Sequence, residues 1–313
     1  MKIFIAGATG VLGRRLIKEF RTRGHSVIGL ARSDANERTI QALGGEPRRA
    51  DLFDSDSLAR AAEGSEVVIH SATAIPTQVK TTPADWAMND RIRRDGTKAL
   101  ARCAELIGAR LYLQQSIVWV ARPHDPSTFD EESPIVPRPL YQSAADSELI
   151  AREAGARAGF TTAILRCGAF YSADAAHTRM MGEQLTKRKF PIIGKGDAVW
   201  SNIHADDAAS AFVAATESAK PGLWHVVDDQ PATIAEVLNY MARALGAPPP
   251  RHVPRWVAAL LAGKGAVEFL TASTRTTNAK IRRDLGWAPR FPSFTSGVDQ
   301  VVTEWRAEGF PRK

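Results

Sequence analysis

Cysteine is scarce in this sequence, with only Cys103 and Cys167 in 313 residues. Neither cysteine stands in a metal-ligand spacing, and two isolated thiols do not make a disulfide framework. We interpret both as buried residues of a protein in a reducing compartment, and we expect no metal site.

Long hydrophobic runs are missing too, because the apolar stretch from Trp256 to Ala262 is too short to cross a bilayer. The N-terminus already reads as a strand, so we expect no cleavable signal and a soluble, cytoplasmic protein without membrane partners. Hydrophobic residues make up 44% of the chain, enough for one α/β domain with a smaller lobe.

No dense basic tract is present, although 41 Lys and Arg against 34 Asp and Glu give a net charge of +7. This modest, scattered excess suits an anionic cofactor and an acidic substrate. It does not indicate a nucleic-acid partner.

What is present is a glycine-rich loop at the start of the chain. An apolar run over residues 1–6 leads into G-A-T-G-V-L-G at positions 7–13, and a helical pattern follows over 14–23. In such a loop one glycine permits a tight turn, one lets the backbone approach a pyrophosphate, and one lets the helix pack on the strand. The helix N-terminus then faces the phosphates. We therefore predict cofactor contacts from Gly7, Thr9, Gly10, Val11, Leu12 and Gly13.

With its G-x-x-G-x-x-G spacing, this loop resembles the cofactor loop of the short-chain dehydrogenase/reductase superfamily, in its extended (epimerase/dehydratase-like) or atypical branches. Further similar segments are V-I-H-S-A at 68–72, L-R-C-G at 165–168, I-H-A-D-D at 203–207 and L-G-W-A-P at 285–289. The resemblance runs almost end to end. It implies a doubly wound parallel α/β sheet (Rossmann) over residues 1–170 plus 200–230, and a smaller substrate-binding lobe over 171–199 plus 231–313.

The cofactor type is predicted from the end of the second strand, residues 25–31. No acidic residue stands there to bind a ribose 2′-hydroxyl; Arg32 and Ser33 follow instead. A guanidinium suits the 2′-phosphate of NADP, so we predict NADP, with NAD as the alternative and a solvated Arg32 as the competing interpretation. Arg14 and Arg38 are candidate helpers. The resemblance implies an adenine contact from Asp51 and Leu52, where Asp51 has capping as its alternative, and a cofactor contact from Ala72.

The catalytic set implied by the resemblance is incomplete. Ser116 matches the catalytic serine, which would orient the substrate oxygen, and Tyr141 matches the tyrosine of Y-x-x-x-K, but the lysine position is Ala145. Counting back from Gly96-Thr97 in the family's N-x-x-G-T puts Arg93 at the asparagine position, while Asn89 lies one helical turn too early. We hypothesise that Arg93 replaces part of the missing positive charge; the alternative is a surface arginine beside Arg91 and Arg94.

Three histidine and aspartate positions have structural interpretations. His70, inside an apolar strand, is expected to be a core residue. His204 is expected to fix its loop, and Asp206 to cap the following helix.

These features predict an NADP(H)-dependent oxidoreductase that reduces a carbonyl of a small organic substrate. A tyrosine without its lysine is a poor base, since a free phenol has a pKa of about 10, but it remains a proton donor. The alternatives are an NAD-recycling nucleotide-sugar epimerase or dehydratase, and a non-catalytic NAD(P)-binding regulator or redox sensor. The resemblance also permits a homodimer.

Overall fold

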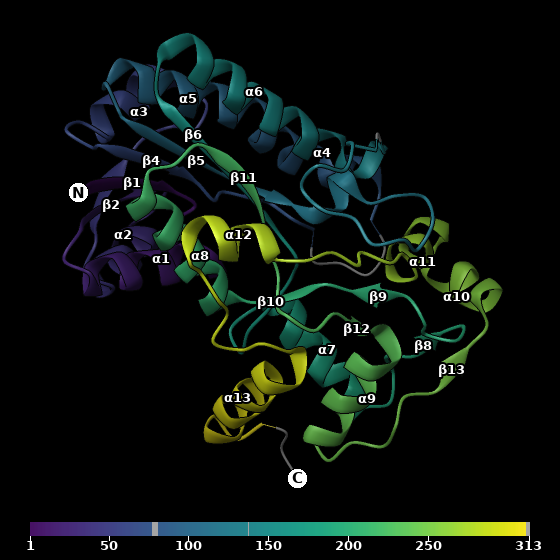
Figure 1. Ribbon diagram of the computed structural model, residues 1–313. Coiled ribbons are helices and arrows are strands. Elements are labelled where there is room, and N and C mark those ends of the chain that lie inside the picture. The colour runs from purple at the N-terminus through teal and green to yellow at the C-terminus, as the bar shows by residue number, and fades with distance from the viewer. Residues whose placement is uncertain (77–80, 137, 311–313) are drawn as a thin grey trace.

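The structure is a computed structural model that describes residues 1–76, 81–136 and 138–310. Its centre is a parallel sheet of seven strands in the order β11-β6-β5-β4-β1-β2-β3 (Figure 1). The strands are β1 (Lys2–Ala6), β2 (Ser26–Ala31), β3 (Glu46–Arg49), β4 (Val67–His70), β5 (Leu111–Ile117), β6 (Thr161–Cys167) and β11 (Gly222–Val226). The order reverses between β1 and β4, and ligands of doubly wound sheets bind beyond the carboxyl ends of the strands at this point. The predicted fold class is confirmed.

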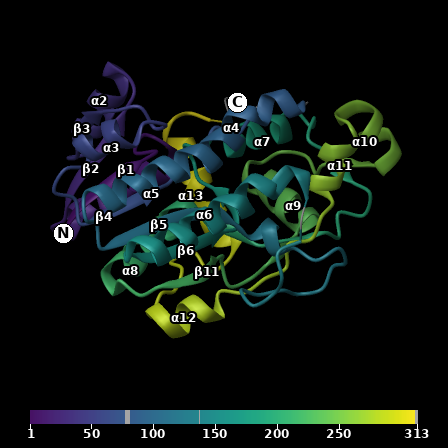
Figure 2. The same cartoon turned by 90° about the horizontal axis from the view of Figure 1, so that it is seen from above.

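Helices cover both faces of the sheet (Figures 1 and 2). One face carries α1 (Val11–Thr22), α2 (Asp34–Ala42), α8 (Ala205–Ser218) and α12 (Ala279–Leu285); the other carries α3 (Ser55–Ala61), α5 (Thr97–Leu106) and α6 (Gln142–Ala158). Side chains alternate along each strand, so Ile3 and Ile5 join the core under α1 and α8, while Phe4 joins the core under α5 and α6. Because both faces are buried, the central strands β1 and β4 are almost entirely apolar, whereas the edge strand β3 is polar and mostly exposed.

A second apolar core lies in the C-terminal part of the chain. It is built around α7 (Ala176–Thr186), α9 (Ile234–Ala244) and α13 (Phe294–Ala307), with Trp305 and Met241 fully buried. Three pairs of short strands accompany it: β7 (Ala169–Tyr171) with β10 (Asn202–His204), β9 (Val199–Trp200) with β12 (Ala232–Thr233), and β8 (Ile192–Ile193) with β13 (His252–Val253). Two helices, α10 (Arg255–Ala262) and α11 (Lys264–Leu270), lie at its edge in Figure 1.

The division into two lobes stays a prediction. Within the segment 231–313, assigned by sequence to the smaller lobe, α12 packs against β11 and α8, and Ile281 and Trp287 belong to the core of the large sheet.

Three elements differ from what the sequence pattern predicts. The pattern over 83–107 predicts one helix, but the structure has α4 (Pro83–Arg91), a π-helical turn (Ile92–Gly96) and α5, since one widened turn barely changes the apolar period. The pattern over 109–120 predicts one strand, but β5 ends at Ile117 and the buried residues Val118–Ala121 form a 3₁₀ turn. The pattern over 254–270 predicts one helix, but the helix breaks at Gly263, whose φ of +90° is outside the helical region.

Among helices of the described residues, none is long and apolar enough to cross a lipid bilayer.

Candidate active site

The glycine loop has the close contacts that a dinucleotide site requires. Gly7 has φ +89°, and a Cβ there would lie 2.5 Å from the backbone nitrogen of Ala72. A Cβ on Gly13 would lie 2.1 Å from the carbonyl oxygen of Gly7, so neither position admits a side chain. Gly10 is the N-cap of α1 without a side-chain cap, and the first turn carries no acidic residue. The free N–H groups of this turn therefore remain open to phosphates, and the loop fits a nicotinamide dinucleotide.

The residues after β2 form an exposed basic corner beside this loop. Ser33 caps α2 by accepting a hydrogen bond from the Asn36 backbone, and the Asn36 amide donates to the Thr9 hydroxyl at 3.3 Å. Asp34 is paired with Arg49. Arg32 is exposed, and its guanidinium has no ion-pair partner in the described part of the chain.

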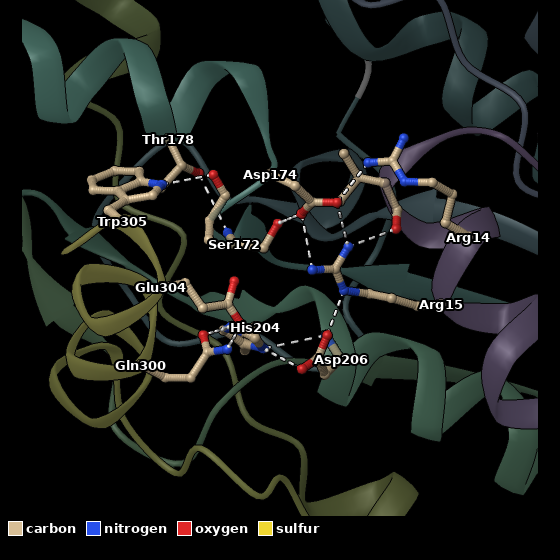
Figure 3. Close-up of polar contacts among 12 residues, drawn as sticks. Arg14, Arg15, Ser172, Asp174, Thr178, His204, Asp206, Gln300, Glu304 and Trp305 are labelled. Carbon is tan, nitrogen blue, oxygen red and sulfur yellow. Dashed lines mark hydrogen bonds and ion pairs between the residues drawn. The ribbon is translucent and has the colours of Figure 1, made fainter. Parts of the chain in front are cut away.

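Arg14 is committed elsewhere. Its Nη1 donates to the Thr9 carbonyl at 2.8 Å, and its Nη2 lies 2.6 Å from Asp174 Oδ2 (Figure 3). Arg15 binds the other oxygen of Asp174 at 2.9 Å and also contacts Asp206. These arginines hold the pKa of Asp174 well below its usual range. These ion pairs join α1 to the segment before α7. Because Arg14 already pairs with Asp174, it is not a free cation for the 2′-phosphate.

His204, not Asp206, caps α8. Its Nδ1 accepts a hydrogen bond from the Asp206 backbone, and its Nε2 lies 3.2 Å from Gln300 Oε1 (Figure 3). Burial lowers the pKa of His204 to about 4, so the ring is neutral at pH 7. These contacts agree with the expectation that His204 fixes its loop. The prediction of Asp206 as the cap is wrong, because the His204 imidazole accepts the hydrogen bond from the first turn of α8 and the Asp206 carboxylate pairs with Arg15 and Arg290.

His70 and Asp51 have local structural contacts. The His70 ring is buried, its Nδ1 accepts a hydrogen bond from the Ala72 backbone at 3.3 Å, and burial lowers its pKa to about 4. Asp51 is exposed, and its carboxylate accepts from the Phe53 backbone at 2.9 Å. Leu52 is buried, beside Gly96 of the π-helical turn. The adenine contacts of Asp51 and Leu52 stay predictions.

Ser116 belongs to a buried polar cluster that the sequence did not reveal. It sits opposite Arg166 in the β5–β6 register, and its hydroxyl donates to Glu148 of α6. The two oxygens of Glu148 accept from Arg166 at 2.8 and 2.7 Å, and both side chains are only 2% exposed. A hydroxyl has one proton, so Ser116 can donate to a substrate oxygen only after it leaves Glu148. The signal available in the sequence was an arginine inside an apolar strand, since such a charge needs a buried partner.

Tyr141 lies just before α6 in an apolar cluster with Trp119, Phe129, Ala144 and Ala145. It is 7% exposed, and among the described residues its hydroxyl has no hydrogen-bond partner. Burial raises the pKa of the phenol, which the charge of Arg138 lowers and that of Glu268 raises to a smaller extent. No hydrogen bond joins Tyr141 and Ser116 in this part of the structure.

Arg93 is a buried residue. It is 8% exposed, its Nη1 donates to the Ser143 hydroxyl at 3.4 Å, and burial lowers its pKa to about 10. Arg91 and Arg94 are more exposed and pair with Asp95 and Asp146. The surface alternative for Arg93 is therefore excluded, and its side chain reaches the start of the helix that follows Tyr141.

The model of the NAD dependent epimerase/dehydratase family matches residues 3–226. The chain belongs to this family. The match includes the glycine loop, Ser116, Tyr141 and all seven strands of the large sheet.

Several known proteins are similar to this protein over nearly the whole chain. The "3-diazoavenalumate denitrifying reductase" of a Streptomyces species is 35% identical over 307 residues, covering 95% of this chain and 99% of the relative. A Stigmatella aurantiaca ketoreductase of a farnesyl dihydroquinoline oxide is 25% identical and covers 96% of each chain. The structure of dTDP-glucose 4,6-dehydratase from Streptomyces venezuelae with NAD superposes with a TM-score of 0.80 at 23% identity, covering 99% of this chain and 98% of that one.

Family membership and these relatives make the protein an NAD(P)-dependent oxidoreductase of the extended short-chain type.

Proposed function

We propose that this protein is an NADP(H)-dependent oxidoreductase that reduces a carbonyl group of a small organic substrate. The observation that carries the proposal is the environment of Tyr141. Burial raises the pKa of its phenol, and the position four residues later is Ala145 in the same apolar cluster. A tyrosine kept protonated is a proton donor, which reduction of a carbonyl needs, and a poor base, which oxidation and epimerisation need.

In this reaction Tyr141 gives its proton to the carbonyl oxygen as the carbon accepts a hydride. NADPH, when bound, supplies that hydride. Ser116 is proposed to orient the oxygen, which requires its hydroxyl to leave Glu148. Arg93 is proposed as a positioning residue that holds Ser143, and through it the start of α6.

The preference for NADP rests on the corner after β2. Arg32 is exposed and unpaired among the described residues, whereas the two nearby carboxylates, Asp34 and Glu37, both pair with Arg49. A 2′-phosphate there would meet a guanidinium that no carboxylate of the described residues already holds. Gly7, Thr9, Gly10, Val11, Leu12 and Gly13 are proposed to hold the pyrophosphate side, with Ser33 and Ala72 alongside.

A second reaction is suggested by the Streptomyces relative, whose name describes a reductase that denitrifies a diazo compound. Replacing a diazonium group by hydride forms one C–H bond and releases N₂, so it needs no proton donor. This suits a site in which Ala145 leaves Tyr141 without a lysine.

Both reactions can be tested with the purified protein. The first measurement is the identity of any cofactor that copurifies with it, because tightly retained NAD would contradict the NADP assignment and favour a self-recycling epimerase or dehydratase. Turnover with NADPH is then measured on a panel of aldehydes, ketones and aryl diazonium salts. Tyr141→Phe should lower kcat on a carbonyl by about 10²- to 10⁴-fold. If Tyr141→Phe leaves turnover of the diazonium probe unchanged and the wild type turns over no carbonyl, the second reaction is the correct one.

A further inference from the structure

Arg122 is a buried guanidinium without a counter-ion. It follows the 3₁₀ turn at the carboxyl end of β5 and is 6% exposed. Its Nε is buried without an acceptor, and its side chain makes no hydrogen bond or ion pair within the described residues. Burying a cation costs free energy unless a partner compensates, so an arginine in this state calls for a ligand.

Arg138 contacts the two residues that follow Arg122 and has a similar deficit. Its Nη2 donates to the carbonyl of Pro123 at 3.1 Å and lies 3.2 Å from His124 Nδ1, so the chain after Arg122 is in contact with Arg138. Its Nε is buried without an acceptor. Neither of its contacts is a carboxylate, so its positive charge also lacks a counter-ion in the described structure.

The loop between the two arginines carries carboxylates that all have other contacts. Asp125 and Asp130 bind within the loop to Ser127 and Ser133, Glu131 accepts from the His225 backbone at 2.7 Å, and Glu132 pairs with Lys280. Four acidic residues thus lie between the two arginines in the sequence without neutralising them. The unpaired charge is therefore not a consequence of a lack of local acids.

The turn before Arg122 shares an apolar cluster with Tyr141, and the charge of Arg138 acts on the Tyr141 phenol. The Arg138 carbonyl accepts from the Tyr141 backbone at 2.9 Å, and the Val136 backbone donates to the Val120 carbonyl at 2.9 Å, which holds the returning loop against the turn before Arg122. Trp119 of that turn also has a buried indole N–H without an acceptor, and its ring stacks on Phe269 of α11 at 5.9 Å. The neighbouring Glu268 is exposed, and its charge raises the pKa of Tyr141 slightly.

We infer that Arg122 and Arg138 form a subsite for a carboxylate carried by the substrate, which fixes the reducible group toward Tyr141. This inference deepens the proposed function and rests on it for the role of Tyr141. Guanidinium groups bind carboxylates through paired N–H donors, and one bound anion would compensate the burial of both cations. The aromatic rings of Trp119 and Phe269 beside them suit an aryl carboxylate.

The first experiment measures binding without chemistry. Benzoate is titrated into the NADPH-loaded protein by calorimetry, with inorganic phosphate in a parallel titration. We expect saturable benzoate binding in the millimolar range or tighter, weakened at least about 10-fold in Arg122→Gln and in Arg138→Gln. Arg152→Gln, which removes an exposed α6 arginine that has no ion pair among the described residues, should bind as the wild type does. Equal benzoate affinity in all four proteins, no saturable binding by the wild type, or tighter binding of phosphate than of benzoate overturns the inference.

The second experiment uses turnover with a matched pair of substrates, 4-carboxybenzaldehyde and methyl 4-formylbenzoate. The wild type should have a lower KM for the acid than for the ester. In both arginine variants the KM for the acid should rise at least about 10-fold, while kcat for the ester stays within about threefold of the wild-type value. An equal loss on both substrates overturns the inference. If no aldehyde is reduced but benzoate binding depends on Arg122 and Arg138, the carbonyl-reductase proposal fails and the carboxylate subsite stands.

Folding is checked by thermal unfolding of each variant without ligand. Removal of an uncompensated charge should leave the Tm of Arg122→Gln unchanged or higher, whereas a structural arginine would lower it. If Arg122→Gln does not fold, that result overturns the assignment of Arg122, and Arg138→Gln, which is only half-buried, tests the remaining part of the subsite.

Discussion

The buried pair of Glu148 and Arg166 offers a sharp test of how the large domain is held together. Replacing Glu148 by Gln removes the charge but keeps the volume of the side chain. Arg166, 2% exposed and with its Nη1 already unpartnered, would then be a buried cation without a counter-ion. Breaking a buried ion pair in this way typically costs about 3–5 kcal/mol.

The size of this loss can be set against the total stability of the protein. Folded domains are stable by about 5–15 kcal/mol, so Glu148→Gln should remove about a fifth or more of that free energy. With a urea m-value of about 3 kcal/mol/M, the midpoint should fall by about 1–1.7 M. The assay is urea unfolding followed by far-ultraviolet circular dichroism and by tryptophan fluorescence, whose transitions should coincide.

A matched double variant separates the lost charge from the lost shape. Glu148→Leu combined with Arg166→Met removes both ions and keeps an apolar contact, so it should recover most of the stability. Ser116 is the third member of this buried cluster. Ser116→Ala serves as its control and should lower the free energy of unfolding by only about 1 kcal/mol. A loss under about 1 kcal/mol for Glu148→Gln, or a double variant no more stable than the single one, would refute the reasoning.

Three further results are expected. Gly13→Ala should abolish binding of NADPH and NADH in a fluorescence titration, because its Cβ would lie 2.1 Å from the Gly7 carbonyl oxygen; retained affinity would contradict the loop geometry. Arg32→Ala should weaken NADPH binding by about 10- to 100-fold and leave NADH binding within about twofold, so an equal loss for both cofactors would remove the case for a 2′-phosphate contact. Burial raises the pKa of Asp228 to about 8, above the value of about 4 in the unfolded chain. Between these two pKa values the folded state binds the proton and the unfolded state does not. The free energy of unfolding should therefore fall as pH rises from about 4 to 8, by up to about 1.4 kcal/mol per pH unit. Asp228→Asn should lack this pH dependence. If the change in Tm between pH 6 and pH 9 is the same in the wild type and in Asp228→Asn, the raised pKa of Asp228 is contradicted.

The local elements and the cofactor loop were readable from the sequence because they depend on short-range rules. The strand–glycine–helix order of residues 1–23 needs only a positive φ at Gly7 and the absence of a Cβ at Gly13, and the apolar central strands follow from a sheet buried on both faces. The absence of a lysine at Ala145 is likewise a fact of the sequence, and it already directed the prediction toward a proton donor.

Partners far apart in the chain were decided only by the tertiary structure. Periodicity does not tell which carboxylate meets which arginine, so the pairs of Arg14 with Asp174 and of Arg166 with Glu148 appeared only when the strands and helices were assembled. The same holds for Arg93, whose burial depends on one widened helical turn. The physical reason is that a charge is stabilised or left uncompensated by whatever the fold brings within a few ångströms of it, and that neighbourhood, as at Arg122, is set by the packing of the whole domain and not by local sequence.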